Sequence, residues 1–161
     1  MVSSPAFRPV QMVVSALLGL YVLLVAFNNT FDYWTNYLFV EKVLSMEDTF
    51  RSGQEWRAIT WKPLVHGFYA LIILLEGISA VLCLSGAYRM LRHRNATEDS
   101  FQAAKMRAVM GVLLGFTLWV GVFLCGGGEW FLMWQSKTWN GQDVAAKLAI
   151  LYGVGLGLLR S

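Results

Sequence analysis

The sequence predicts an all-α fold: a four-helix transmembrane bundle with an interfacial amphipathic helix or cap in the long outer loop. The chain of 161 residues is 57% hydrophobic and only 14% charged, whereas soluble domains are about 45–50% apolar with about a quarter of their residues charged. Its apolar residues also gather into four segments, two of which clearly exceed the roughly 20 residues that span a bilayer. We therefore expect a single integral membrane domain over residues 1–161.

The four predicted spans cover about residues 10–29, 64–91, 106–134 and 142–159. The first span ends at Asn28-Asn29 without a small-residue cleavage site, so we expect a retained helix rather than a signal peptide. The second is the longest. The third contains three consecutive glycines, which favour a kink or a close backbone approach. The fourth reaches spanning length only with its polar shoulders.

The long outer loop, residues 28–63, has its own helical pattern. Apolar positions such as Tyr33, Tyr37 and Val40 recur at helical intervals, with polar residues such as Asn36 between them. This pattern is typical of an amphipathic helix that lies in the membrane interface. A cap packed over the bundle would use the same apolar face, and periodicity leaves the two interpretations open.

An even number of spans places both termini and the polar loop 92–105 on one side of the membrane. That side carries seven Lys and Arg residues, five of them within residues 89–107, whereas the other side carries six that are more widely spread. Because cytoplasmic segments next to spans are enriched in Lys and Arg, we expect both termini in the cytoplasm. His66 and His93 then face opposite sides, so they cannot jointly hold one haem or metal ion within the chain.

Glu76 is the candidate intramembrane functional carboxylate. It lies about 12 residues into the second span, roughly 18 Å deep at 1.5 Å per residue, where a charged side chain is expensive. The small residues Ala80, Cys83 and Ala87 continue its helical face and allow another helix to approach closely. Two interpretations stay open: a proton-relay or cation-site carboxylate, and a neutral carboxyl group hydrogen-bonded to a neighbouring helix.

Glu129 and Lys147 are predicted to form a structural ion pair. Counted from the turn between the last two spans, both lie at similar depth, roughly 9–10 Å inside the outer boundary. Such a pair would offset the desolvation of both charges and align the two helices. Glycines spaced four apart, at Gly111 and Gly115 and again at Gly153 and Gly157, suit helix–helix contacts.

Six of the seven tryptophans fall at or beyond the outer ends of the spans. Most of them fit an aromatic belt at the headgroup level. The residues near these ends also form a candidate outer-interface site: Trp56, Arg57, His66, Trp130 and Trp134.

Motifs of known chemistry are missing from the sequence. It contains no phosphate-binding glycine loop, no H-E-x-x-H, no G-x-S-x-G and no C-x-x-C-H. We therefore expect no enzymatic activity, no catalytic residue, no metal site and no cofactor of its own, while a haem or quinone shared with a partner subunit stays open. The basic residues form no stripe of the kind that binds nucleic acid.

Four blocks of the chain, taken in order, resemble a known family. They lie at Asn28–Met46, at Trp56–Ile59, at Glu76 and at Gly128–Gln142. Together they resemble the bacterial family of predicted small integral membrane proteins catalogued as domain of unknown function 2165. The resemblance implies four spans and an inner-membrane location in a bacterium, and it implies no activity. Lys42 stands where the family often has His, which argues against a metal site in that loop.

Three functions are compatible with these observations. The first is an accessory or structural subunit that binds the bilayer and other membrane proteins, or self-associates; the small size, the glycine spacings and the tryptophan-rich outer face favour it. The second is a small oligomeric transporter or proton-coupled channel that uses Glu76. The third is a quinone- or lipid-binding redox subunit that uses His66, Tyr69 and the Trp56-Arg57 pair.

Overall fold

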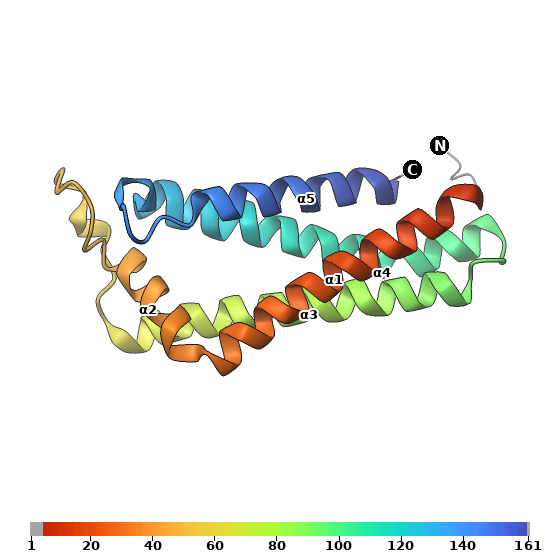
Figure 1. The fold of residues 1–161 in the computed structure, drawn as a ribbon, viewed down its shortest axis with the longest axis horizontal. Coiled ribbons are helices and arrows are strands. Elements are labelled where there is room, and N and C mark those ends of the chain that lie inside the picture. Colours follow the sequence, from red (N-terminus) through yellow and green to blue (C-terminus); the bar gives the residue numbers. More distant parts are fainter. Residues whose placement is uncertain (1–4, 161) are drawn as a thin grey trace.

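The computed structural model describes residues 5–160, and this part of the chain is helical with short connections (Figure 1). Four helices are long and apolar enough to cross a membrane, as the sequence predicts. The elements in chain order are η1 (Pro5–Phe7), α1 (Arg8–Phe31), α2 (Tyr33–Leu44), η2 (Glu55–Arg57), α3 (Lys62–Arg92), α4 (Glu98–Thr117), η3 (Leu118–Trp130), η4 (Met133–Gln135) and α5 (Gln142–Arg160). The third span therefore consists of α4 and η3 together and ends at Trp130, four residues before its predicted end.

The four spans form an elongated bundle in which α3 packs against both α1 and α4, and α5 packs against α4 and η3 (Figure 1). The described ends of the chain lie at one end of the bundle with the connection 93–97, and we call this the terminal end. Residues 45–61 and 131–141 lie at the opposite end, which we call the loop end. This arrangement agrees with an even number of spans.

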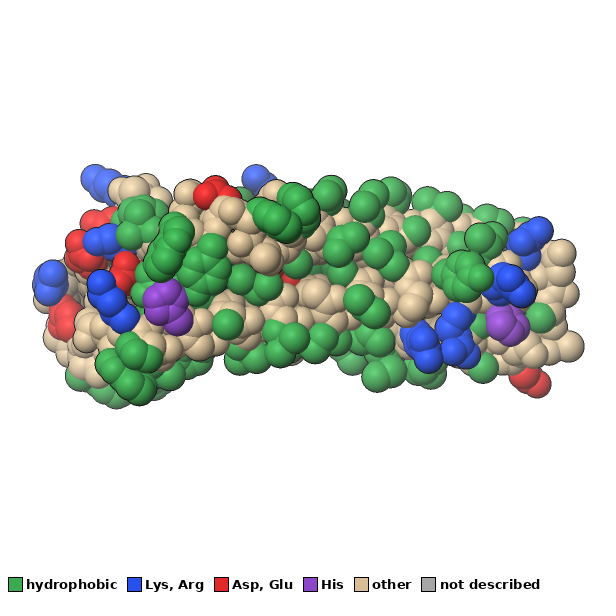
Figure 2. Space-filling view, turned by 90° about the horizontal axis from the view of Figure 1, so that it is seen from below, with side chains coloured by type: hydrophobic (Ala, Val, Ile, Leu, Met, Phe, Trp, Pro, Cys, Tyr) green, Lys and Arg blue, Asp and Glu red, His purple; other side chains and the backbone are tan. Residues whose placement is uncertain are grey.

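The middle of the bundle presents mainly apolar side chains outward, between two ends that carry most of the charged residues (Figure 2). Large apolar side chains on the spans, including Leu17, Leu24, Leu74 and Ile150, are about half exposed or more. In water this surface would be unfavourable, and in a bilayer it faces acyl chains. The distribution supports a protein that spans the membrane.

Small residues let α3 approach its neighbours closely, as the sequence predicts. A Cβ atom added to Gly111 of α4 would lie 2.6 Å from the backbone nitrogen of Cys83, and one added to Gly86 would collide with the backbone of Ala108. Gly115, four residues after Gly111, packs against the ring of Tyr152 on α5. In the second predicted pair, Gly157 has open space around it, so only the first pair forms a close helix–helix contact.

Hydrogen bonds from side chains to backbone carbonyls join the spans at these crossings. Ser15 on α1 donates to the carbonyl of Cys83 at 2.9 Å, and Ser79 on α3 donates to that of Gly111 at 2.8 Å. Tyr152 on α5 donates to Leu18 on α1 at 3.1 Å. Because a membrane interior offers no water as an alternative partner, these bonds hold the helices in one register.

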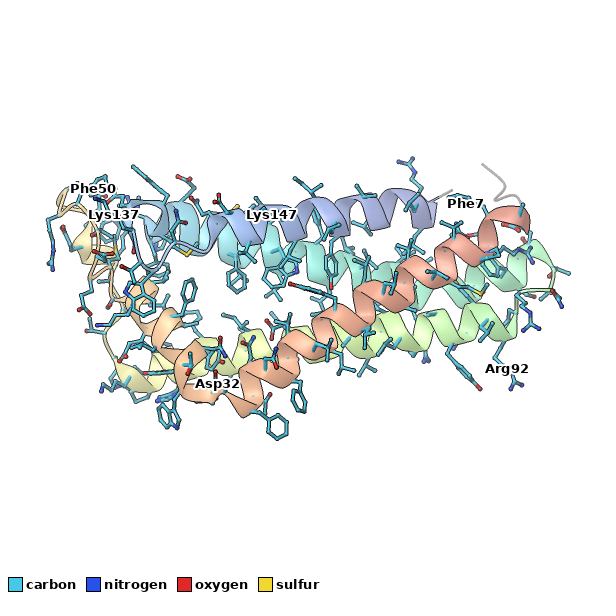
Figure 3. All side chains as sticks on the ribbon, viewed as in Figure 1. Phe7, Asp32, Phe50, Arg92, Lys137 and Lys147 are labelled. Carbon is cyan, nitrogen blue, oxygen red and sulfur yellow. The ribbon has the colours of Figure 1, made fainter. Side chains whose placement is uncertain are left out.

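Helix α2 packs against the bundle, as the cap interpretation of the outer loop expects. It follows α1 after a break at Asp32, well short of Phe50 at the tip of the loop end (Figure 3). Its residues Tyr37, Val43 and Leu44 are buried against α3 and the chain that follows, whereas Trp34 stays 70% exposed. The apolar face that the sequence assigns to an interfacial helix is therefore used for packing within the chain.

The loop-end part of the third span, η3, is a π-helix of 13 residues. The i→i+5 hydrogen bonds of a π-helix form a wider turn than those of an α-helix, and such segments are rare and short in proteins. The three glycines at residues 126–128 lie within it, so the predicted kink takes the form of a widened helix. The segment ends at Trp130, and two residues later Leu132 has a left-handed backbone with φ 55°.

Candidate functional site

Glu76 is completely buried near the middle of α3, and a side chain of α1 holds it there. The Nδ2 atom of Asn29 donates to both carboxylate oxygens, at 3.0 Å to Oε1 and 2.8 Å to Oε2. Asn29 is one of the last four residues of α1, whose carbonyls lack partners within the helix. The Tyr69 hydroxyl donates to the Asn29 carbonyl at 2.8 Å and so holds this helix end against α3.

Glu76 lines a pocket of about 170 Å³ whose walls come from α1, α2, α3 and η3; we call it the carboxylate pocket. Trp119, at the start of η3, lines it from the opposite helix and is only 5% exposed. Its indole Nε1–H has no hydrogen-bond partner within residues 5–160. Two residues that line the carboxylate pocket therefore have spare hydrogen-bonding capacity, Glu76 as an acceptor and Trp119 as a donor.

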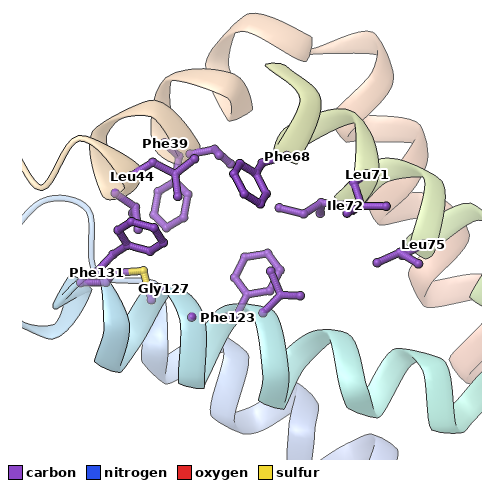
Figure 4. A pocket seen from close by; sticks show the side chains of 14 residues that line it. Phe39, Leu44, Phe68, Leu71, Ile72, Leu75, Phe123, Gly127 and Phe131 are labelled. Carbon is purple, nitrogen blue, oxygen red and sulfur yellow. The ribbon is translucent and has the colours of Figure 1, made fainter. Parts of the chain in front are cut away.

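A second pocket of about 210 Å³ lies beside the first, towards the loop end; we call it the apolar pocket. Its lining residues are all apolar or glycine, and they come from α2, α3, η3 and the segment after η3 (Figure 4). Four residues form walls of both pockets: Phe39, Val40, Ile72 and Phe123.

The apolar pocket opens towards the lipid-facing surface. Phe68 and Leu71 of α3 and Val122 of η3 line the pocket and are 39%, 48% and 38% exposed. These residues lie on membrane-spanning helices, so their exposed faces meet acyl chains. The apolar pocket therefore faces the bilayer, and the carboxylate pocket adjoins it behind the side chains that the two pockets share.

His66, a member of the predicted outer-interface site, lies in an aromatic cluster beside the end of α1. Its Nδ1 atom is 2.7 Å from the hydroxyl of Tyr33, and its ring stacks on that of Tyr37 with centroids 4.1 Å apart. Tyr69 joins the same cluster through Tyr33. Burial raises the pKa of Tyr37, and the charge of Glu41 acts in the same direction, so this hydroxyl is neutral at neutral pH.

The other residues of the predicted outer-interface site form two separate groups. The guanidinium group of Arg57 lies over the rings of Trp56 and Trp130, 5.5 Å and 5.0 Å from their centroids, and donates to the Trp130 carbonyl. Trp134 instead packs edge-on against Phe50. The structure thus divides the five predicted residues into three clusters rather than one site.

The predicted ion pair between Glu129 and Lys147 is not present. Both side chains are exposed, and neither takes part in the ion pairs found among residues 5–160, which join Arg8 to Glu98 and Lys42 to Glu47. The prediction counted α-helical turns down both spans. Glu129 belongs to the π-helix, whose wider turns change both the depth and the direction of its side chain.

Asn29 and Trp119 are the site residues that sequence reasoning missed. Asn29 belongs to the pair of asparagines at the end of the first apolar run, where the sequence indicates only a polar residue that flanks a span. Trp119 is the one tryptophan inside a span rather than at its outer end, and that position was the available signal. Neither sequence position shows that the residue lies near Glu76, because this proximity depends on how α1, α3 and the third span cross.

His66 and His93 lie at opposite ends of α3, about 40 Å apart along the helix. In the described part of the chain, no three His, Cys, Asp or Glu side chains come together as metal ligands would. The two histidines therefore lie at opposite ends of the bundle, which agrees with the prediction that they face opposite sides of the membrane.

Comparisons with known proteins agree with this architecture. No curated protein and no solved structure matches the chain. A family model described as "Predicted small integral membrane protein (DUF2165)" matches residues 7–160, which is nearly the whole chain and all four spans. The protein therefore belongs to the DUF2165 family of predicted small integral membrane proteins.

Proposed function

We propose that this protein binds an amphipathic small molecule that enters from the bilayer. Its apolar tail would occupy the apolar pocket, and its polar head would reach Glu76 and Trp119 in the carboxylate pocket. The observation that supports this most is the completely buried Glu76 carboxylate at the wall of a pocket that adjoins an all-apolar one. A site with an apolar lining and a few convergent polar groups is typical of small-molecule binding.

The unfilled hydrogen-bonding capacity of the site indicates the chemistry of the head. Asn29 supplies Glu76 with one amide nitrogen, whereas a carboxylate has about four lone-pair positions. Trp119 offers a donor without an acceptor. A hydroxyl group donates to a carboxylate and accepts from an indole N–H, so an isoprenoid alcohol or a quinol fits both. The ligand class is that of the third sequence-based hypothesis, a quinone- or lipid-binding protein, but the proposed site lies at Glu76 rather than at His66 and the Trp56-Arg57 pair, and it has no redox role.

The proposed role is binding, with no catalytic residue and no cofactor of the protein's own. A second function, as an accessory subunit, is supported by a different surface. Several loop-end tryptophans are half exposed or more, and they provide rigid amphipathic area for a partner or for the headgroup layer. The residues concerned are Trp34, Trp56, Trp61 and Trp130.

Filling the apolar pocket tests the proposed binding. A Cβ added to Gly127 would make ordinary contacts with Met133 at 3.5 Å, so the larger side chain of Gly127→Leu would extend into the pocket (Figure 4). Gly157→Leu is the matched control, because Gly157 is exposed with open space around it. Protein purified in mild detergent is extracted with organic solvent, and the extract is analysed by mass spectrometry.

We expect an apolar-tailed hydroxyl compound to co-purify in stoichiometric amount with the wild type and with Gly157→Leu. Gly127→Leu should lose it, and Glu76→Gln should retain much less, because a neutral amide accepts a weaker hydrogen bond than a carboxylate. Elution volume and thermal unfolding confirm that each variant is folded. Equal amounts of every apolar compound in the wild type, Gly127→Leu and Glu76→Gln would refute the proposal.

For the cellular location we propose the inner membrane of a bacterium, with both termini in the cytoplasm. The basic residues of the terminal end support this orientation. Seven Lys and Arg residues stand there against two acidic residues, Glu98 and Asp99. Lys and Arg next to spans set orientation by favouring the cytoplasmic side.

A further inference from the structure

A third pocket, of about 360 Å³, lies at the terminal end between the first turns of α4 and the last turn of α5. It is remote from the carboxylate pocket and shares no lining residue with it. Its polar lining residues are Gln102 and Lys105 of α4 and Arg160 of α5. Its remaining lining residues are apolar, so it combines two cationic side chains with an apolar wall.

Lys105 is the unusual feature of this pocket, because it is a lysine that is only 4% exposed and forms no salt bridge within residues 5–160. The carboxylate on the same face of α4, Glu98, is bound by Arg8 at 2.8 Å and also accepts from Gln102. Glu98 also acts electrostatically on Lys105, but in the described part of the chain no acidic residue lines the pocket, so the positive charges of Lys105 and Arg160 are in excess there. The pocket is therefore built to receive an anion.

The surroundings of Lys105 identify the kind of anion. Arg107, two residues further along α4, is exposed. Basic residues of the other helices also gather at the terminal end of the bundle (Figure 2). Lys and Arg residues next to the ends of transmembrane spans lie near the phosphates of a leaflet. Basic pockets between transmembrane helices are known to bind anionic lipid head groups.

An apolar track continues from the pocket along α4 towards the middle of the membrane. Met106 lines the pocket, and Met110 and Leu113 follow it one and two turns later on the same face of α4. These three side chains are 58%, 54% and 51% exposed, so they are available to an acyl chain. A free phosphate ion would make no use of this track, whereas a phospholipid would cover it.

We propose that this pocket binds an anionic phospholipid, with Lys105 and Arg160 contacting the phosphate and an acyl chain lying along Met106, Met110 and Leu113. Arg160 contributes a planar guanidinium group that can bind two phosphate oxygens at once. Lys105 contributes a point charge from inside the bundle. The site is independent of the proposed ligand of the carboxylate pocket.

The test measures how phosphatidylglycerol binds to the purified protein in detergent, by native mass spectrometry and by thermal stabilisation. Phosphatidylcholine with the same acyl chains is the neutral comparison, and inorganic phosphate at the same concentration is the free-anion comparison. The variants are Lys105→Met and Arg160→Met. Arg107→Met is the matched control, because Arg107 lies at the same end of α4 outside the pocket.

We expect phosphatidylglycerol to bind and stabilise the wild type and Arg107→Met, and phosphatidylcholine to do so weakly. Lys105→Met and Arg160→Met should each weaken phosphatidylglycerol binding about five-fold, the factor that corresponds to roughly 1 kcal/mol per basic residue. If Lys105→Met does not fold, Arg160→Met alone provides the test. Equal binding by the wild type and the folded pocket variants would overturn the proposal. Stabilisation by inorganic phosphate equal to that by the lipid would also overturn it, by assigning the pocket to a free anion.

Discussion

The Glu76–Asn29 contact is the central polar interaction of the membrane interior at the residue scale. The carboxylate is completely buried, and a single amide nitrogen reaches both of its oxygens. A buried polar group that loses its hydrogen-bond partner pays its full desolvation cost, so removal of the Asn29 amide would leave the buried Glu76 carboxyl group unsatisfied. Asn29 therefore stabilises the buried Glu76 side chain, whatever ligand the pocket binds.

The variant Asn29→Leu tests whether Asn29 stabilises Glu76. It should lower the free energy of unfolding by about 1–3 kcal/mol, because it leaves the buried carboxylate without its donor. Asn28→Leu is the matched control, since Asn28 is exposed at the neighbouring position. The measurement is thermal unfolding in detergent. Equal midpoints for the two variants would show that Asn29 contributes nothing to holding Glu76.

The crossing of α3 and α4 decides the geometry of the bundle at the element scale. At Gly86 the two backbones approach so closely that an added Cβ would collide with Ala108. Gly77, nine residues earlier on α3, has nothing within 4 Å of the same position. The same helix therefore contains one glycine required by packing and one that is not.

The pair of substitutions Gly86→Ala and Gly77→Ala separates packing from helix propensity. Gly86→Ala should destabilise the protein by about 1–3 kcal/mol, the usual penalty for overpacking a tight contact. Gly77→Ala should leave stability unchanged or raise it, because alanine restricts the unfolded chain more than glycine does. Unfolding midpoints of the two variants in one detergent give the comparison. A loss of stability in Gly77→Ala as large as that in Gly86→Ala would contradict the close crossing.

The π-helix η3 acts at the same scale, because it shapes the wall of both pockets. Phe123 belongs to η3 and lines the two pockets, while Gly126 and Gly127 line the apolar one. A glycine in this wall leaves space that a larger side chain would fill. The widened turn also moves Glu129 away from the position that α-helical counting assigns to it.

At the scale of the whole molecule, the two ends of the bundle differ in chemistry. The terminal end is basic, and Arg8 joins it to the connection between α3 and α4 by donating to the carbonyls of Arg94 and Ala96. The loop end is rich in aromatic side chains and carries acidic and basic residues together (Figure 2). This asymmetry supports the proposed orientation, with the terminal end in the cytoplasm.

Reporter fusions test that orientation directly. Fusions after Ser100 and after Ser161 should both report a cytoplasmic location, because an even number of spans separates them. A reporter inserted at Gly53, in the loop-end segment, should report the opposite side. Opposite locations for the Ser100 and Ser161 fusions would remove α5 as a span. Both of them outside would reverse the orientation.

The number of spans, the shared end of the termini, the helix in the outer loop and the position of Glu76 inside the bundle could all be predicted from the sequence. These features depend on local hydropathy, helical periodicity and the expense of one charge in an apolar run, each of which a single segment contains. The partner of Glu76 could not be predicted, because Asn29 reaches it only where α1 crosses α3 at a particular angle and rotation. The two pockets depend on the same crossings together with the cap formed by α2.

The predicted pair of Glu129 and Lys147 shows the limit most clearly. Depth and direction were counted in α-helical turns, and a π-helix of 13 residues changes both. No local sequence pattern predicts the change from α-helix to π-helix, because the glycines at residues 126–128 permit a kink, a close backbone approach or a wider turn equally. Only packing of η3 against α5 and α3 selects among them. Tertiary structure therefore decides which polar groups of this protein meet, because hydropathy places a helix in the membrane but leaves its rotation to its neighbours.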